Sequence, residues 1–211
     1  MEREVKKVVP SNLGWLELKL SQTEMNYLWG LVVDEKKETF RNHLAGNLEE
    51  SNVLVDKDDW FFENTLLPLC NAYADAFKDM GYKCGITHKH PYCLSAFWVN
   101  YQKKHEFNPI HTHFGIYSFV IWMRIPTRHD EQNELPMSKG TNYQVASDFM
   151  FTYTNMFGEI DGYTYEMNPE LEGTLLFFPA KLNHQVYPFY NCDDTRITIS
   201  GNISLNSKVV L

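Results

Sequence analysis

Three histidines offer the clearest chemistry in this sequence. His111 and His113 are separated by one residue, and His184 follows an apolar, strand-like run that ends at Pro179. Alternate side chains of a strand point to the same face. The first two imidazoles can therefore bind one metal ion, to which His184 adds a third nitrogen. Imidazole suits iron, copper, nickel and zinc alike, so the ligand type alone leaves the metal open.

A second group of residues that could bind a ligand follows His184 after one turn and one strand. In residues 196–200, alternation places Arg196, Thr198 and Ser200 on one face and two isoleucines on the other. An arginine that faces the interior of a barrel needs an anion. Its planar fork suits a carboxylate, and a neighbouring hydroxyl can add a hydrogen bond. The sequence thus predicts a carboxylate-binding group near the metal.

The elements that must position these residues are mostly strands. From about residue 92 the sequence is a series of short apolar runs with turn signals between them and no helices, which is typical of a sandwich or jelly roll. An aromatic content of 15% favours the same β-rich core. The expected strands are 92–101, 110–113, 116–125, 149–154, 163–167, 174–178, 185–190 and 196–205.

The first ninety residues have a different pattern. Ser21 and Glu24 form a capping box, which predicts the start of a helix. A longer helix is expected over about 58–80, and Pro68 should kink or divide it. We expect both helices to pack on the outside of one sheet. The fold class is therefore mainly β with N-terminal α-helices.

Composition and charge narrow the classes of function. The 211 residues carry a net charge of −8, which repels phosphate backbones, so we expect no nucleic-acid partner. No apolar run approaches the roughly 20 residues that span a bilayer, so we expect no membrane association. The N-terminus shows no signal peptide and the four cysteines are widely spaced, as in reduced thiols. A cytoplasmic location follows as an expectation.

We expect one domain over 1–211. Residues 1–90 would form a helical support, and 91–211 a jelly-roll core that carries 127–172 as an insertion. Part of that insertion, 143–167, is expected either to cover the pocket as a lid or to extend a sheet. The pair His88 and His90 lies beside a glycine and a proline, which indicates an exposed loop.

Several motifs occur in order between residues 92 and 205. They are Phe97-Trp98-Val99-Asn100, His111-Thr112-His113, Gly173 to Pro179, His184-Gln185-Val186-Tyr187-Pro188 and Arg196 to Asn202. Together they resemble the iron(II)/2-oxoglutarate-dependent oxygenases, most closely the small members found in bacteriophages and marine bacteria. The resemblance implies a double-stranded β-helix, Fe(II) and 2-oxoglutarate as cofactors, and O2 as a further substrate. It also implies a phage-encoded protein of the host cytoplasm.

By this resemblance, His111 and His184 are metal ligands, and the third ligand is either His113 or a water molecule in its place. Most of the superfamily has aspartate or glutamate where this chain has His113. Three neutral imidazoles would leave the site with one more unit of positive charge. The implied reaction is hydroxylation of an unknown substrate, a small molecule or a peptide, with succinate and carbon dioxide as co-products.

The resemblance also implies where 2-oxoglutarate would bind. Arg196, with Thr198, would hold its distal carboxylate. Many relatives carry a tyrosine on the strand after the histidine pair, where this chain has Trp122. Since an indole cannot accept a hydrogen bond, we assign that polar role to Ser118, which shares a strand face with Trp122. Asn100 is a further candidate because of its place in the motif.

Two other interpretations stay open at this point. Cupins also place His-x-His and a later histidine on a jelly roll, and would act as dioxygenases or isomerases without 2-oxoglutarate. The glutamate that their first motif requires is replaced here by Tyr117 and Ser118. The second interpretation is a non-catalytic jelly-roll binding protein with a vestigial histidine cluster.

Overall fold

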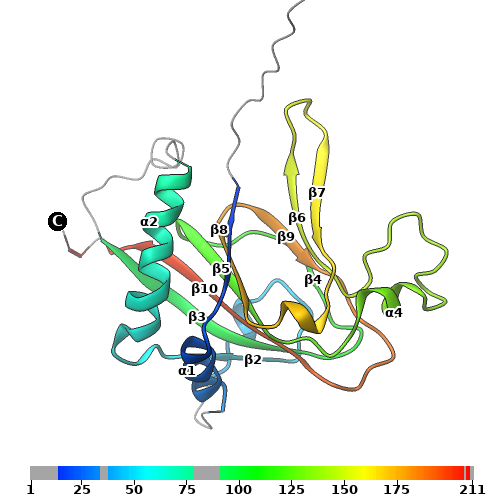
Figure 1. The fold of residues 1–211 in the computed structure, drawn as a ribbon, viewed down its shortest axis with the longest axis horizontal. Helices are drawn as coiled ribbons and strands as arrows, with labels where there is room; N and C mark the ends of the chain where they lie inside the picture. The colour runs from blue at the N-terminus through cyan, green and yellow to red at the C-terminus, as the bar shows by residue number, and fades with distance from the viewer. Residues whose placement is uncertain (1–13, 34–37, 78–90, 207, 210–211) are drawn as a thin grey trace, which may run out of the picture.

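Two antiparallel sheets face each other in the computed structural model, which describes residues 14–33, 38–77, 91–206 and 208–209 (Figure 1). The larger sheet has the strand order β1-β8-β5-β10-β3-β2, and the smaller one β4-β9-β6-β7. All pairings are antiparallel. The fold is the mainly β jelly roll that the sequence predicts.

The strand bounds agree with the predicted ones in the centre of the larger sheet. They are β1 Leu16–Lys19, β2 Glu50–Val53, β3 Tyr92–Gln102, β4 Asn108–His111, β5 Tyr117–Arg124, β6 Phe149–Thr154, β7 Ile160–Tyr165, β8 Thr174–Pro179, β9 Asn183–Val186 and β10 Arg196–Leu205. β10 matches its predicted range, and β3 is one residue longer. The prediction of a strand over 110–113 is wrong in its bounds, because β4 ends at His111 and His113 lies beyond it.

The helical elements lie mostly before β3. They are α1 Gln22–Val32, 3-10 turns at Arg41–His43 and Lys57–Asp59, a π-helical turn at Phe62–Leu66, α2 Leu67–Ala76, α4 His129–Asn133 and a 3-10 turn at Pro169–Leu171. None of the described helices is long and apolar enough to span a lipid bilayer.

The two predicted helix signals are confirmed. The Ser21 hydroxyl accepts from the Glu24 amide at 3.3 Å, and the Glu24 carboxylate accepts from the Ser21 amide at 2.7 Å. Pro68 lies in the first turn of α2, where the chain passes directly from the π-helical turn into the α-helix. The single helix expected over 58–80 is therefore divided, and the part of it after residue 77 falls outside the described residues.

Helices and the smaller sheet cover opposite faces of the larger sheet (Figure 1). Apolar side chains of α1 and α2 pack against alternate residues of the strands, among them Val99, Phe119 and Ile199. The intervening residues, such as Val120 and Phe178, point toward the smaller sheet. The alternation that separates these two cores also decides which β3 and β10 side chains face the space between the sheets.

Two segments contribute more to the sheets than the sequence suggests. Residues 1–90, expected as a helical support, also supply β1 and β2 at the two edges of the larger sheet. Residues 127–172, expected as an insertion, supply β6 and β7. Since β6 pairs with β9, this part of the segment completes the smaller sheet.

Candidate metal centre and the adjoining cavity

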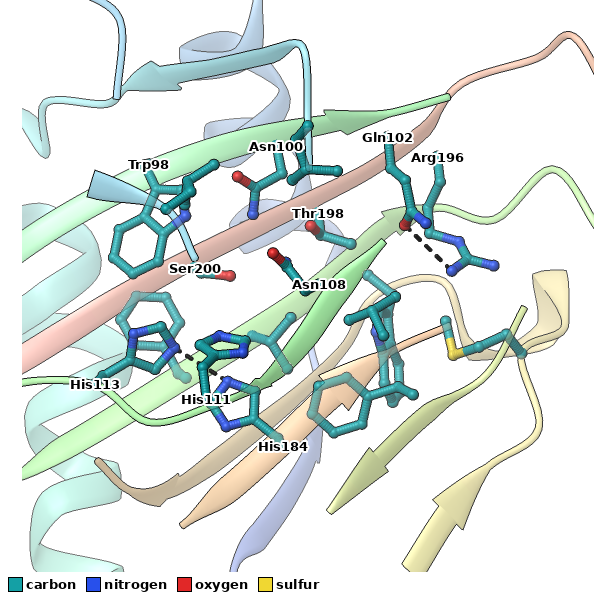
Figure 2. Close-up of a pocket in the computed structure, with 18 of the residues that line it drawn as sticks. Trp98, Asn100, Gln102, Asn108, His111, His113, His184, Arg196, Thr198 and Ser200 are labelled. Carbon is teal, nitrogen blue, oxygen red and sulfur yellow. Dashed lines mark hydrogen bonds between the residues drawn. The ribbon is translucent and has the colours of Figure 1, made fainter. Parts of the chain in front are cut away.

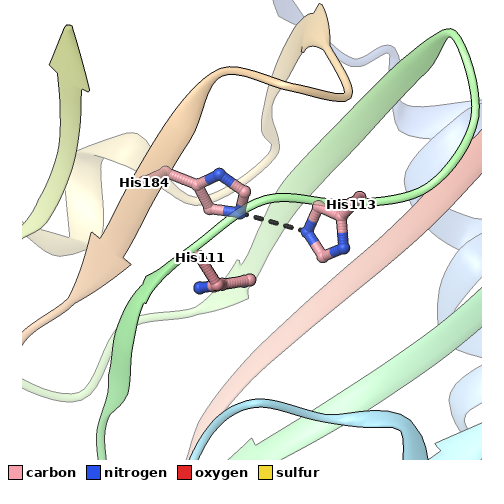
Figure 3. Close-up of side chains that lie close together, drawn as sticks. All are labelled: His111, His113 and His184. Atoms are coloured by element: carbon pink, nitrogen blue, oxygen red, sulfur yellow. Dashed lines mark hydrogen bonds between the residues drawn. The ribbon is translucent and has the colours of Figure 1, made fainter.

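Three imidazoles converge at one end of the smaller sheet (Figure 3). His111 on β4 and His184 on β9 are cross-strand partners, which places their side chains next to each other. His113 reaches the same point from the turn after β4, where its amide donates to the Ala180 carbonyl at 2.8 Å. One ligand nitrogen of each histidine lies within 4.8 Å of the others. The predicted triad therefore forms, although the alternation argument does not apply to His113.

Backbone contacts orient two of the three rings. Nδ1 of His111 lies 2.7 Å from the Pro109 carbonyl oxygen, and Nδ1 of His184 lies 2.9 Å from that of Leu182. Because a carbonyl only accepts, each Nδ1 carries the proton and each Nε2 presents a lone pair. Such a contact is the usual support of a metal-bound histidine.

The spacing of the nitrogens fits a metal ion. Nε2 of His113 lies 3.1 Å from Nε2 of His184. Two nitrogen ligands at right angles on a metal, each about 2.1 Å from it, would lie about 3 Å apart. The donor set is thus compatible with a first-row divalent cation.

Burial keeps the three rings neutral. It lowers the pKa of His111, lowers that of His113 to about 4 with help from the charges of His111 and Lys181, and holds that of His184 well below its usual value. At neutral pH all three are therefore in the form that binds a metal cation.

A cavity between the sheets extends from the histidines to Arg196 (Figure 2). β3 contributes Trp98, Asn100 and Gln102, and β10 contributes Arg196, Thr198 and Ser200. Its remaining wall is largely apolar and aromatic, with Val120, Trp122, Phe149, Phe178 and Val186. No aspartate or glutamate is among its described lining residues.

Arg196 is a buried cation whose hydrogen-bonding capacity is only partly used. It is 1% exposed and stacks over the Phe189 ring at 5.1 Å. Its Nη1 donates to Gln102 at 3.4 Å and its Nη2 to the Ser147 hydroxyl, while Nε has no partner. Among the described residues no carboxylate lies close enough to form an ion pair with it, although the charge of the buried Asp148 carboxylate acts on it and raises its pKa against the effect of burial.

The environment of Arg196 therefore fits a carboxylate ligand. Burial lowers its pKa to about 10, so the guanidinium is still charged at neutral pH. A buried charge without a partner is costly, and a planar fork with free donors suits a carboxylate. The cavity thus has three histidines that could hold a metal ion at one end and a buried guanidinium at the other.

Comparison with known proteins agrees with this combination. Residues 96–202 match a family described as "Putative 2OG-Fe(II) oxygenase". The chain belongs to this oxygenase family. No curated protein matches the chain in sequence.

Solved structures show that this oxygenase shares its fold with distant 2-oxoglutarate enzymes. A prolyl-4-hydroxylase of Pseudomonas putida aligns with a TM-score of 0.51 at 13% identity, covering 90% of this chain and 92% of the other. A 2OG-Fe(II) oxidoreductase of Burkholderia pseudomallei gives 0.52 at 14%, covering 90% and 85%. The carbocyclase SnoK of nogalamycin biosynthesis gives 0.55 at 9%, covering 92% and 80%. These alignments indicate a double-stranded β-helix.

The oxygenase brings most of the predicted residues of the 2-oxoglutarate pocket together. Thr198 and Asn100 both line the cavity that contains Arg196. The Ser51 hydroxyl lies 2.9 Å from the Asn100 side-chain oxygen and 3.0 Å from the Val99 carbonyl oxygen, so it connects β2 to the Asn100 side chain and to the backbone of β3. Trp122 also lines the cavity.

Ser118 is not brought to the cavity. It is fully buried, and its hydroxyl lies 2.9 Å from the Gly201 carbonyl oxygen and 3.0 Å from the side-chain oxygen of Asn202. Both partners belong to β10, which lies beside β5 in the larger sheet. The hydroxyl therefore links two strands, and Ser118 is absent from the lining residues of the oxygenase cavity.

Sequence reasoning overlooked two residues that contact Arg196. Gln102 is the cross-strand partner of Arg196 and continues the alternation of Trp98 and Asn100 on β3, so the pattern contained the signal. Ser147 lies in the loop before β6, and nothing in its surroundings along the sequence marks it. The pair His88 and His90 lies outside the described residues.

An open groove adjoins the metal end of the oxygenase cavity. It shares Trp98, Asn108, His111 and His113 with the cavity, and Phe40, His43 and Phe114 line it further out. Phe40 stacks on Trp98 at 4.5 Å. None of the described lining residues of the groove is an aspartate, glutamate, lysine or arginine. The groove therefore offers an uncharged, partly aromatic surface beside the triad.

Proposed function

We propose that this oxygenase is a hydroxylase that binds Fe(II) through His111, His113 and His184 and binds 2-oxoglutarate through Arg196. The observation that carries the proposal is the incompletely satisfied, buried Arg196 in the same cavity as the three neutral imidazoles. A metal site alone would fit many enzymes. A metal site with a buried cation that lacks a carboxylate partner fits a metal-dependent enzyme with an acidic cosubstrate.

The chain's own residues would each contribute to binding or orientation. Iron(II), when bound, supplies the activation of O2 that oxidises a C–H bond, with conversion of 2-oxoglutarate to succinate and carbon dioxide. Arg196 would bind the distal carboxylate, and the Thr198 hydroxyl would donate a further hydrogen bond to it. Asn100 lies on the same wall and would orient the cosubstrate. The aromatic wall with Trp122 and Phe149 would exclude water from the reacting atoms.

The substrate would enter through the open groove beside the triad. No acidic side chain lines the described part of the groove, and the Lys181 ammonium lies over the Phe114 ring at 5.2 Å, so the substrate portion held there would carry no positive charge. Trp98 is 2% exposed and its indole N–H has no partner, so it is available to an acceptor atom of the substrate. A small molecule and a peptide both meet this requirement.

Anaerobic titration tests the proposed cofactors directly. Fe(II) is added to the metal-free protein, followed by 2-oxoglutarate, while the visible absorption is recorded. We expect iron to bind first and a weak charge-transfer band to appear only after 2-oxoglutarate is added. Iron binding without the band would contradict chelation of the cosubstrate, and absence of iron binding would contradict an iron enzyme. Succinate release then serves as the readout in a search for substrates.

The identity of the third ligand can be tested by substitution. His113→Asp is expected to retain Fe(II), because two imidazoles and one carboxylate are a common ligand set for non-haem iron and the carboxylate offsets one unit of charge. His113→Ala is expected to bind Fe(II) at least about tenfold more weakly than His113→Asp. Equilibrium dialysis under argon measures both affinities. Loss of iron from a folded His113→Asp protein would show that imidazole itself is required at this position.

A further inference from the structure

Ser147 has an unusual backbone conformation for a buried residue. Its φ is +77°, in the left-handed region that costs energy for any residue with a Cβ. Among the described residues, the other non-glycine residues with positive φ are all exposed, whereas Ser147 is fully buried. They are Asp58, Asp59, His105 and Asn191. Strain that persists inside a protein is commonly imposed by its surroundings for a functional reason.

Hydrogen bonds on both sides of the residue impose this conformation. The Ser147 amide donates to the Pro188 carbonyl at 2.9 Å. The next residue, Asp148, accepts from the Tyr187 amide through its carbonyl at 2.9 Å and from the Met167 amide through its carboxylate at 3.0 Å. The same carboxylate lies 2.9 Å from Nδ1 of His129. The backbone around Ser147 is thus fixed by contacts to three other segments.

The strained conformation brings the Ser147 hydroxyl to Arg196. The hydroxyl oxygen accepts from Nη2 of Arg196 and lies 2.9 Å from the Thr127 hydroxyl. On the other side of the guanidinium, Gln102 accepts from Nη1. The Gln102 amide nitrogen donates to the Glu106 carbonyl at 2.6 Å, so its oxygen must face Arg196. One acceptor on each Nη leaves Nε without a partner and one further hydrogen free on each Nη.

We propose that Ser147 is a positioning residue that holds the Arg196 guanidinium so that Nε and one free Nη hydrogen point at the distal carboxylate of 2-oxoglutarate. This inference rests on the proposed function. Ser147 is not among the residues that line the cavity, so it acts through Arg196 rather than on the ligand. Its hydroxyl already restricts the rotation of the guanidinium in the unliganded protein. Binding of the carboxylate therefore costs less conformational entropy.

Two substitutions separate the hydroxyl from the backbone strain. Ser147→Gly removes the hydroxyl and relieves the strain, because glycine adopts positive φ readily. Ser147→Ala removes the hydroxyl and keeps the strain. If the hydroxyl positions Arg196, both variants bind 2-oxoglutarate about tenfold more weakly than the wild type. Ser147→Gly is nevertheless expected to unfold at a temperature no lower than Ser147→Ala.

Calorimetric titration of 2-oxoglutarate into Mn(II)-loaded protein measures the effect without turnover. The Mn(II) affinity should be unchanged in both variants, since Ser147 contacts none of the three histidines. Ser138→Ala is the matched control, because it removes another buried serine hydroxyl from the same segment. We expect it to retain the wild-type affinity for 2-oxoglutarate.

The outcomes distinguish the two proposals. Wild-type affinity for 2-oxoglutarate in folded Ser147→Gly would overturn the positioning role and leave the proposed function standing. An equal loss of Mn(II) and 2-oxoglutarate affinity would also overturn it, since this indicates general disruption of the site. Failure of the Mn(II)-loaded wild type to bind 2-oxoglutarate would overturn the proposed function and this inference together.

Discussion

Replacement of Arg196 by glutamine is expected to weaken 2-oxoglutarate binding by about two orders of magnitude. A hydrogen bond between charged groups contributes roughly 1.5–3 kcal/mol, which corresponds to about a 10- to 150-fold change in affinity. Arg196 is 1% exposed, so water cannot replace the lost donor to the buried carboxylate. Calorimetric titration of 2-oxoglutarate into Mn(II)-loaded Arg196→Gln measures the change.

A second arginine provides the matched control. Arg124 is half exposed and pairs with Asp194 at the surface at 3.2 Å. Arg124→Gln makes the same chemical change outside the cavity, and we expect wild-type affinity for 2-oxoglutarate. Equal affinities of Arg196→Gln and the wild type would remove Arg196 from the cosubstrate site, provided that both proteins show the same circular dichroism spectrum.

The largest effect on the metal is expected from His184→Ala. His184 is 4% exposed and its ring packs against Phe149 and Phe178, which hold it at the cavity. The binding free energy of a structural metal site with four ligands is roughly 10–16 kcal/mol, which is about 3 kcal/mol for each ligand. Loss of one ligand therefore predicts a loss of more than about 100-fold in metal affinity. Fe(II) content after anaerobic dialysis is the measurement.

His43→Ala is the control for that experiment. His43 lines the groove and packs on Phe40 at 5.1 Å, but it is not a member of the triad. We expect this variant to retain stoichiometric Fe(II). If folded His184→Ala also retains stoichiometric Fe(II), the triad is not the iron site.

The features that the sequence predicted correctly depend on local patterns. The alternation in residues 196–200 places Arg196, Thr198 and Ser200 in one cavity, because β10 pairs with β3 in unbroken register over that stretch. The capping box predicts the start of α1 because the two side chains and the amides they contact lie within one turn. Both patterns are set by a few neighbouring residues, so they can be recognised without knowledge of any distant partner.

The features that the sequence missed depend on partners far along the chain. Ser118 lies on the predicted strand, but its hydroxyl contacts Gly201 and Asn202 on the neighbouring strand and does not reach the cavity. Ser147 contacts Arg196 because distant segments hold its backbone at positive φ, and no neighbouring residue in the sequence indicates this. His113 joins the triad although β4 ends two residues before it.

The order of strands in the larger sheet has a consequence for how the protein is made and handled. Its two outermost strands, β1 and β2, both precede the matched region 96–202, and Leu16 of β1 pairs with Phe177 of β8. On a ribosome, β1 is synthesised first but gains its partner only when most of the chain has emerged, and such long-range pairing slows folding. A fragment cut at the limits of the matched region would present β8 and β3 as open edges, which invite other chains to add a strand. Material for the experiments above should therefore be expressed with its N-terminal strands.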